Sequence, residues 1–215
     1  AMMLAPLLSP FVSGALSLTV GDKKLMFSSL KAGLISVFIA VSLSFIEVIP
    51  FPVSLNPTLQ MVSTPSIIGI LLSVFVGAAA ALTFVTGLRD QIAGVAVAIA
   101  LVPPISSIGI GLRMTDLKLV IDASTVASMN MLAVIISGYV CFKLLGLKPS
   151  TYYKEKQAQQ IKYLVPIAII IFSVLAAPVA YSSYQNYENY VSETQFESHA
   201  KEFFGDKLLK TSSTD

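Results

Sequence analysis

Long apolar stretches without charge constrain the fold of this 215-residue chain more than any other feature. A helix needs about 20 apolar residues to cross roughly 30 Å of hydrocarbon. About six stretches approach that length, at residues 2–20, 32–49, 67–86, 92–112, 123–142 and 163–181. They are too long and too continuously apolar for the alternating strands of a membrane barrel. We therefore expect an all-α, polytopic transmembrane helical bundle of about six spans.

The composition supports a membrane class and argues against most soluble functions. Hydrophobic residues make up 55% of the chain and charged residues only 12%, which is too apolar for a soluble domain. The net charge of +2 gives no footprint for nucleic acid. A single cysteine, Cys141, and a single histidine, His199, cannot form a metal cluster or a catalytic triad. We expect no enzyme activity, no cofactor, no metal site and no nucleic-acid partner.

The distribution of lysine and arginine predicts an orientation, because positively charged loops stay cytoplasmic. Loops 21–31 and 143–162 are rich in lysine, so both are predicted to be cytoplasmic in a multi-pass protein of the cell (inner) membrane. The segment 50–65 has no lysine or arginine, and the C-terminal tail is acidic, so both are predicted to lie outside. Six alternating spans satisfy all four assignments.

The last part of the chain differs in composition from the rest. Residues 1–182 form the predicted transmembrane domain, and residues 183–215 form a predicted acidic extramembrane tail with a short amphipathic helix. Tyr181, Tyr184, Tyr187 and Tyr190 recur every three residues, which is typical of an aromatic belt at the membrane interface.

Two adjacent prolines interrupt the fourth apolar stretch, "AIALVPPISSIGIGL", residues 98–112. Proline has no amide hydrogen and clashes with the carbonyl four residues earlier, so Pro103 and Pro104 are expected to break the helix and free carbonyl groups. In hydrocarbon such groups persist only where protein or water satisfies them. The first stretch has a similar "APLLSP" segment. The candidate substrate path therefore contains Pro6, Ser9, Pro10, Ser13, Pro103, Pro104, Ser106 and Ser107. The alternative is a proline kink packed against neighbouring helices.

An internal similarity relates the two halves of the chain. Asp116 lies 94 residues after Asp22, and the same shift aligns Pro104 with Pro10 and Leu119 with Leu25. The shift spans three segments, an odd number, so the halves would enter the membrane from opposite sides as a 3+3 inverted repeat with proline-broken helices. Chance similarity within an apolar alphabet is the alternative.

The other polar or small residues within or between the spans have two interpretations each. Asn130 either bonds across helices or joins the substrate path. Arg89 and Asp90 form either an interfacial pair or a gate. Four small residues of the third stretch recur every fourth position and predict close helix packing, either within the protomer or between protomers of a homo-oligomer. These four are Gly69, Ser73, Gly77 and Ala81.

Three segments also resemble a prokaryotic membrane family, the uncharacterised hydrophobic domain or domain of unknown function 389. They are "AMMLAPLLSPFVSGALSLTVGD", "GVAVAIALVPPISSIGIGL" and "ASMNMLAVI", and the resemblance covers about residues 1–146. It implies a bacterial or archaeal multi-pass membrane protein. Family members usually have more apolar sequence upstream, which implies a further span before residue 1. The family threonine next to the retained Asn130 is Met129 in this chain. The resemblance implies no activity.

Two functional hypotheses follow from these features. The first is a transporter or channel for a small solute or ion, with its site at the broken helices near the bilayer midplane. The second is a non-transporting scaffold or subunit of a membrane complex, which would hold partners through the tail and through the small-residue stripe formed by Gly69, Ser73, Gly77 and Ala81. A hydrated cavity at the two prolines would favour the first hypothesis, and a dry packed kink would favour the second. In both, we expect the lipid bilayer as a partner and a homo-oligomer.

Overall fold

The computed structural model describes residues 8–50, 57–87, 90–149, 163–179 and 181, and these residues form helices and no strands. The helices are α1 (Leu8–Val20), α2 (Lys23–Glu47), α3 (Pro57–Ser63), α4 (Ile67–Thr86), α5 (Asp90–Met114) and α6 (Leu117–Leu144). A further apolar helix spans Leu164–Val179. The predicted all-helical class is confirmed for this part of the chain.

Three of the described helices, α2, α4 and α6, are long and apolar enough to cross a membrane. The other predicted spans coincide with shorter apolar helices, Ser9–Val20, Ile99–Met114 and Leu164–Val179. Helix α3 was not predicted, because seven residues are too few to show a clear helical period. The coarse prediction of membrane-type helices is therefore supported.

Two of the long helices, α2 and α6, start at capping aspartates that lie before the apolar stretches seen in the sequence. Asp22 accepts a hydrogen bond from the Leu25 amide at 3.1 Å, and Asp116 accepts one from the Leu119 amide at 3.1 Å. A capping carboxylate satisfies an amide that has no partner within the helix. As a result, most of the predicted loop 21–31 is the start of α2, and its lysines project from a helix.

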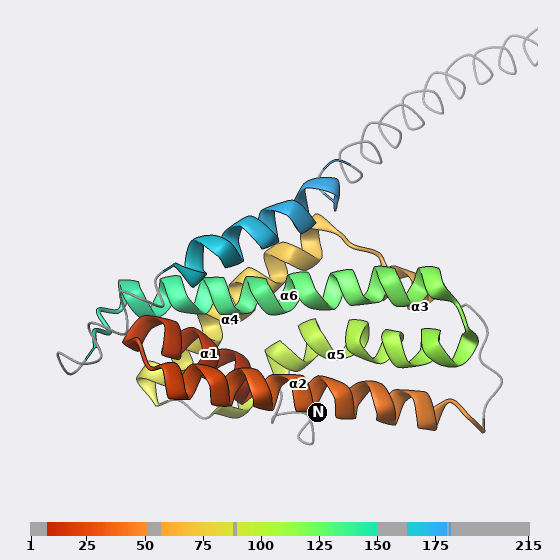
Figure 1. The fold of residues 1–215 in the computed structure, drawn as a ribbon, viewed down its shortest axis with the longest axis horizontal. Coiled ribbons are helices and arrows are strands. Elements are labelled where there is room, and N and C mark those ends of the chain that lie inside the picture. Colours follow the sequence, from red (N-terminus) through yellow and green to blue (C-terminus); the bar gives the residue numbers. More distant parts are fainter. Residues whose placement is uncertain (1–7, 51–56, 88–89, 150–162, 180, 182–215) are drawn as a thin grey trace, which may run out of the picture. The chain divides into compact units, whose positions relative to one another are not determined.

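The turns that join α1 to α2 and α5 to α6 lie at opposite ends of the bundle (Figure 1). Helix α2 begins, and α6 ends, at the same end of the bundle. The core that these helices enclose contains apolar side chains of α1, α4, α5 and α6. Its fully buried members include Ala81, Leu101, Ile105, Val134 and Phe142.

Helix α4 packs tightly against α6 through small residues. A Cβ placed on Gly77 would lie 2.6 Å from the Val134 carbonyl oxygen and would also clash with the Ser137 hydroxyl. Glycine therefore allows the two backbones to approach each other, as small residues do between membrane helices. Ser73 and Ala81 are fully buried on the same face of α4.

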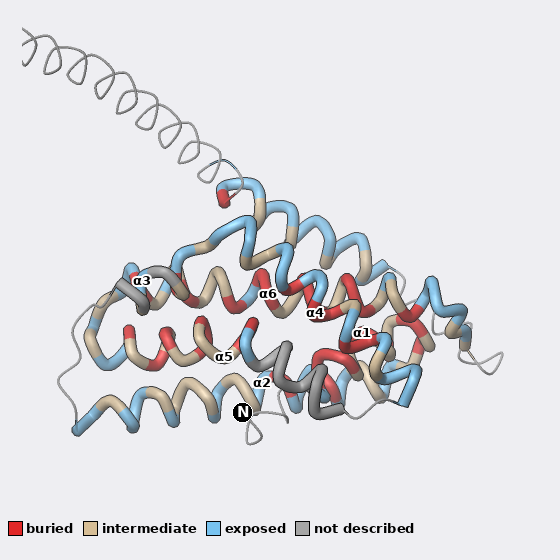
Figure 2. Tube along the Cα trace, turned by 180° about the vertical axis from the view of Figure 1, so that it is seen from behind, coloured by how far each residue is buried: buried red, intermediate tan, exposed pale blue. Residues whose placement is uncertain are grey.

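The outward faces of the helices are strongly apolar. Phe27 and Phe38 of α2 are 69% and 72% exposed, and Phe75 of α4 is 72% exposed. Figure 2 shows the exposed residues of α2 along its outer side. A water-soluble monomer rarely exposes so much apolar surface, whereas a bilayer covers it.

The chain divides into two compact units, Ala1–Ala176 and Ala177–Asp215. The helices α1 to α6 and the site described below belong to the first unit. The predicted acidic tail, its amphipathic helix and the tyrosines after Tyr181 lie outside the described residues.

Candidate functional site

The double proline lies inside a continuous helix. Helix α5 runs from Asp90 to Met114 with Pro103 and Pro104 in its interior. The expectation that these prolines unwind α5 is therefore wrong. A physical reason lies in a side-chain hydrogen bond that replaces one of the two missing amide donors.

Asn130 supplies this bond. Pro104 has no N–H for the carbonyl of Ala100, which lies four residues earlier. The Asn130 Nδ2 of α6 donates a hydrogen bond to that carbonyl oxygen at 2.9 Å. Asn130 is only 6% exposed, so the bond forms where an unpaired carbonyl would be costly. The side chain of α6 thus replaces a backbone donor that α5 lacks.

A serine hydroxyl adds a second bond beside the prolines. Ser107 Oγ donates to the Pro103 carbonyl oxygen at 2.9 Å, and Ser107 is fully buried. Ser106 is half-buried. Serine hydroxyls often bond the carbonyl four residues earlier in membrane helices. Both serines thus lie close to the proline pair, and the Ser107 hydroxyl bonds within α5.

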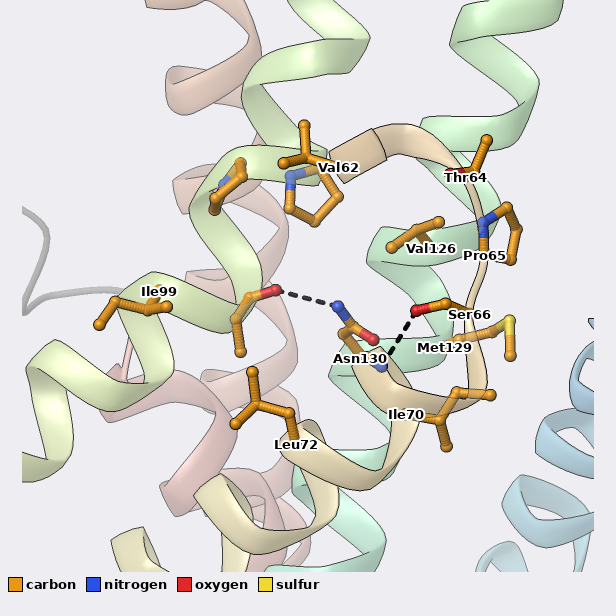
Figure 3. Close-up of a pocket in the computed structure, with 14 residues that line it drawn as sticks. Val62, Thr64, Pro65, Ser66, Ile70, Leu72, Ile99, Val126, Met129 and Asn130 are labelled. Carbon is orange, nitrogen blue, oxygen red and sulfur yellow. Dashed lines mark hydrogen bonds between the residues drawn. The ribbon is translucent and has the colours of Figure 1, made fainter. Parts of the chain in front are cut away.

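A cavity of about 160 Å³ lies beside the prolines and Asn130 (Figure 3). Its walls come from the end of α3, the connection to α4, the start of α4, and the middle of α5 and α6. The lining residues are Val62, Thr64, Pro65, Ser66, Gly69, Ile70, Leu72, Ile99, Ala100, Pro103, Pro104, Val126, Met129 and Asn130.

The polar groups of the cavity come from three elements. Ser66 caps α4, and its Oγ accepts a hydrogen bond from the Gly69 amide at 3.1 Å. Thr64 lies in the connection just before it, and Asn130 lies on α6. Figure 3 shows Ser66 and Asn130 on adjacent walls. The lining residues include no charged side chain.

The structure brings together some of the predicted path residues and separates others. Pro103, Pro104 and Asn130 line the cavity. Ser9, Pro10 and Ser13 lie on α1, where Pro10 is buried and Ser9 is exposed, and none of the three lines this cavity. The predicted meeting of the two proline segments at one site is therefore not seen in the described residues.

The side chains of three predicted residues lie outside the described part of the structure. Pro6 and Arg89 lie outside the described residues. Asp90 begins α5, but its side chain is likewise outside the described part of the structure. The predicted pair of Arg89 and Asp90 stays a prediction.

The small-residue stripe has two environments. Gly69 lines the cavity, whereas Ser73, Gly77 and Ala81 lie further along α4 and are buried in the bundle. Gly77 makes its close approach to α6 of the same chain.

Ser66 and Thr64 were not identified as site residues from the sequence. A serine directly before an apolar run is a helix-start signal, and this signal could have identified Ser66.

The fold and the cavity define a helical protein with membrane-type spans and a neutral, partly polar pocket beside a double proline. A family model described as "Domain of unknown function (DUF389)" matches residues 2–136. The chain belongs to this family, which confirms the resemblance seen in the sequence.

One protein of similar sequence is longer than the part that this chain matches. It is an uncharacterised protein of Methanocaldococcus jannaschii, 29% identical over 182 residues. The match covers 84% of this chain and 57% of the relative, so the chain spans little more than half of that protein. No solved structure matches the chain with significance.

Proposed function

We propose that this protein is a transporter or channel for a small solute in the cell membrane, with its site at the cavity beside Pro103 and Pro104. The observation that carries the proposal is the cavity itself, whose wall includes the proline pair and the buried amide of Asn130. A merely packed kink would need the Asn130 bond to the Ala100 carbonyl, but it would not need a space of about 160 Å³ beside that bond. Polar cavities between membrane helices are where substrates bind.

The membrane topology is part of this proposal. Six spans would place α1, α2, α4, α5, α6 and Leu164–Val179 across the bilayer. The exposed lysines Lys23 and Lys24 of α2 and Lys143 of α6 lie at the end of the bundle where α2 begins and α6 ends (Figure 1). By the positive-inside rule this end is cytoplasmic.

We also propose the inverted repeat, and its two helix turns support it. The Asp22 amide donates to the Ser17 carbonyl at 3.1 Å, and the Asp116 amide donates to the Gly111 carbonyl at 3.1 Å. Both aspartates have nearly the same backbone angles, φ −95° and ψ 100° for Asp22 and φ −92° and ψ 94° for Asp116. The residues before them, Gly21 and Thr115, both have positive φ. Every pair is related by the same shift of 94 residues.

Helix contacts give a second line of support for the repeat. A Cβ placed on Gly109 of α5 would lie 2.8 Å from the Ser44 Cβ of α2. A Cβ placed on Gly138 of α6 would lie 3.1 Å from the Ala15 Cβ of α1. The shift of 94 relates Gly109 to Ala15 and Gly138 to Ser44. The contact of Gly109 with Ser44 therefore corresponds, between the two halves, to the contact of Ala15 with Gly138. Two halves in opposite orientation are a common architecture of secondary transporters.

Water access to the cavity tests the proposal. Val126 and Leu132 are both half-buried on α6, but only Val126 lines the cavity. In a Cys141→Ser background, we expect a membrane-impermeant thiol reagent to label Val126→Cys and to leave Leu132→Cys unlabelled. Lys118→Cys, at an exposed and charged position in the first turn of α6 at the opposite, outer end of the bundle, is the positive control for reagent added outside. If Val126→Cys is not labelled while the positive control is labelled, the cavity is dry, and this result would argue against transport.

The scaffold is the second candidate function. The observation in its favour is the exposed apolar side of α2, which a protein partner could cover as well as lipid. The small-residue stripe gives it less support, because Gly77 already packs on α6. A dry cavity in the labelling experiment would make the scaffold the better proposal.

A further inference from the structure

We infer that the cavity beside the double proline binds an uncharged small molecule with at least one hydroxyl or amide N–H group. This inference rests on the proposed transport function and names the substrate class of the same site. It follows from the charge, the hydrogen-bonding capacity and the size of the cavity.

The charge of the lining argues against an ionic substrate. None of the lining residues carries a charge. Transfer of an ion from water into such a site is costly unless an opposite charge or many hydrogen bonds compensate it. A neutral molecule loses much less solvation free energy on entry.

The available ligands also suit a bare metal cation poorly. Hard cations in proteins require about six or more close oxygen ligands. Among the lining residues, only Thr64, Ser66 and Asn130 have side-chain oxygens. The volume of about 160 Å³ is also far larger than a single dehydrated ion occupies.

The hydrogen bonds already made in the wall determine what the site still offers. Asn130 uses its Nδ2 for the Ala100 carbonyl, while its Oδ1 accepts hydrogen bonds. Ser66 Oγ accepts from the Gly69 amide, which leaves its own O–H as a donor. A hydroxyl can bond to either group, because it can donate to Asn130 and can accept from Ser66. A primary amide does the same with its N–H and carbonyl.

The rest of the lining is apolar and suits a carbon skeleton. Val62, Ile70 and Leu72 face the cavity from α3 and α4, and Val126 and Met129 face it from α6. Small-molecule sites in proteins commonly combine such apolar walls with a few polar groups that set orientation. The composition of this cavity therefore fits small polyols, alcohols and amides.

Flux through purified protein in liposomes tests this inference. Uptake of glycerol and urea is followed by light scattering, and uptake of K⁺ and Cl⁻ is followed in the same vesicles with ion-sensitive dyes. We expect glycerol or urea to enter faster than into protein-free liposomes, with no increase for either ion.

Variants at Ser66 connect the flux to the cavity. Aspartate and asparagine both cap helices well, so Ser66→Asp and Ser66→Asn should keep α4 intact. We expect Ser66→Asp to slow the neutral solute by at least about tenfold, because its hydrated carboxylate occupies the cavity. Ser66→Asn should slow it less. Ser28→Asp is the charge-matched control on the exposed surface of α2 and should keep the original rate.

The possible outcomes separate the two proposals. Faster entry of K⁺ or Cl⁻ without glycerol or urea would overturn the neutral substrate class while supporting transport. Equal effects of Ser66→Asp and Ser28→Asp would place the path elsewhere and overturn the assignment of this cavity. No increase for any of the four probes would count against the transport function and this inference together.

Discussion

The amide of Asn130 on α6 donates to the carbonyl of Ala100 on α5 at 2.9 Å, at the position where Pro104 cannot donate. This bond replaces one of the two amide donors that the interior prolines of the continuous helix α5 lack. It also holds the wall of the cavity, since Ala100, Pro104 and Asn130 all line it. The stability of α5 and the shape of the site therefore depend on the same side chain.

Removing that side chain should be costly, and removing the proline should compensate. We expect Asn130→Ala to lower the free energy of unfolding by about 1–3 kcal/mol, because the Ala100 carbonyl loses its donor. In the double variant with Pro104→Ala, the new amide at position 104 can bond that carbonyl, so much of the loss should be recovered. Thermal unfolding in detergent micelles measures both. Additive losses in the double variant would contradict this explanation.

The packing of α4 on α6 should be sensitive to one methyl group. Gly77→Ala should destabilise the protein by about 1–3 kcal/mol, because the added Cβ meets the Val134 carbonyl and the Ser137 hydroxyl. Gly14→Ala is the matched control, since its Cβ would have no neighbour within 4 Å. That control should gain about 0.5–1 kcal/mol from helix propensity. Both values come from the same unfolding assay, and equal effects would refute the close contact.

The two aspartate caps should contribute equally if the turns are equivalent. We expect Asp22→Ala and Asp116→Ala each to reduce stability by about 1 kcal/mol. Asp22→Asn and Asp116→Asn should reduce it less, because an asparagine oxygen also accepts from the helix amide. Chemical unfolding of the four variants makes the comparison. A large loss at one position and none at the other would weaken the proposed repeat.

The residues before those caps should respond in opposite directions. Thr115 has φ +53°, which is unfavourable for a β-branched residue, so Thr115→Gly should raise stability by up to about 1 kcal/mol. Gly21 has φ +75°, so Gly21→Ala should lower stability by about 1 kcal/mol. Melting temperatures of the two variants measure these effects. A loss in Thr115→Gly would show that the threonine side chain stabilises this turn.

Hydropathy predicted the apolar helices well but not their starts. The run from Ala32 to Ile49 was identified, while α2 begins at Lys23 because Asp22 caps it. Charged residues in the first turns of a helix lower hydropathy without breaking the helix, so the capping aspartate is a better boundary signal. The same reasoning applies to Asp116 and α6.

The proline pair could be found from sequence, but its consequence could not. The missing amides of Pro103 and Pro104 are covalent facts, and they identify which carbonyls of α5 need another donor. The donor for Ala100 is Asn130, 30 residues later on another helix. Only the packing of α5 against α6 brings them together, and this changed the expected unwound turn into a continuous helix.

The sequence by itself determined the helical class, the apolar helices, the family and the missing amide donors of the proline pair, because these depend on local composition and covalent structure. The tertiary structure decided that α4 packs on α6 at Gly77 and that the start of α4, α5 and α6 line a cavity with Asn130 in its wall. It also left Ser9, Pro10 and Ser13 away from that cavity. Contacts between distant segments depend on how complete helices fit together, and local sequence patterns do not encode that fit.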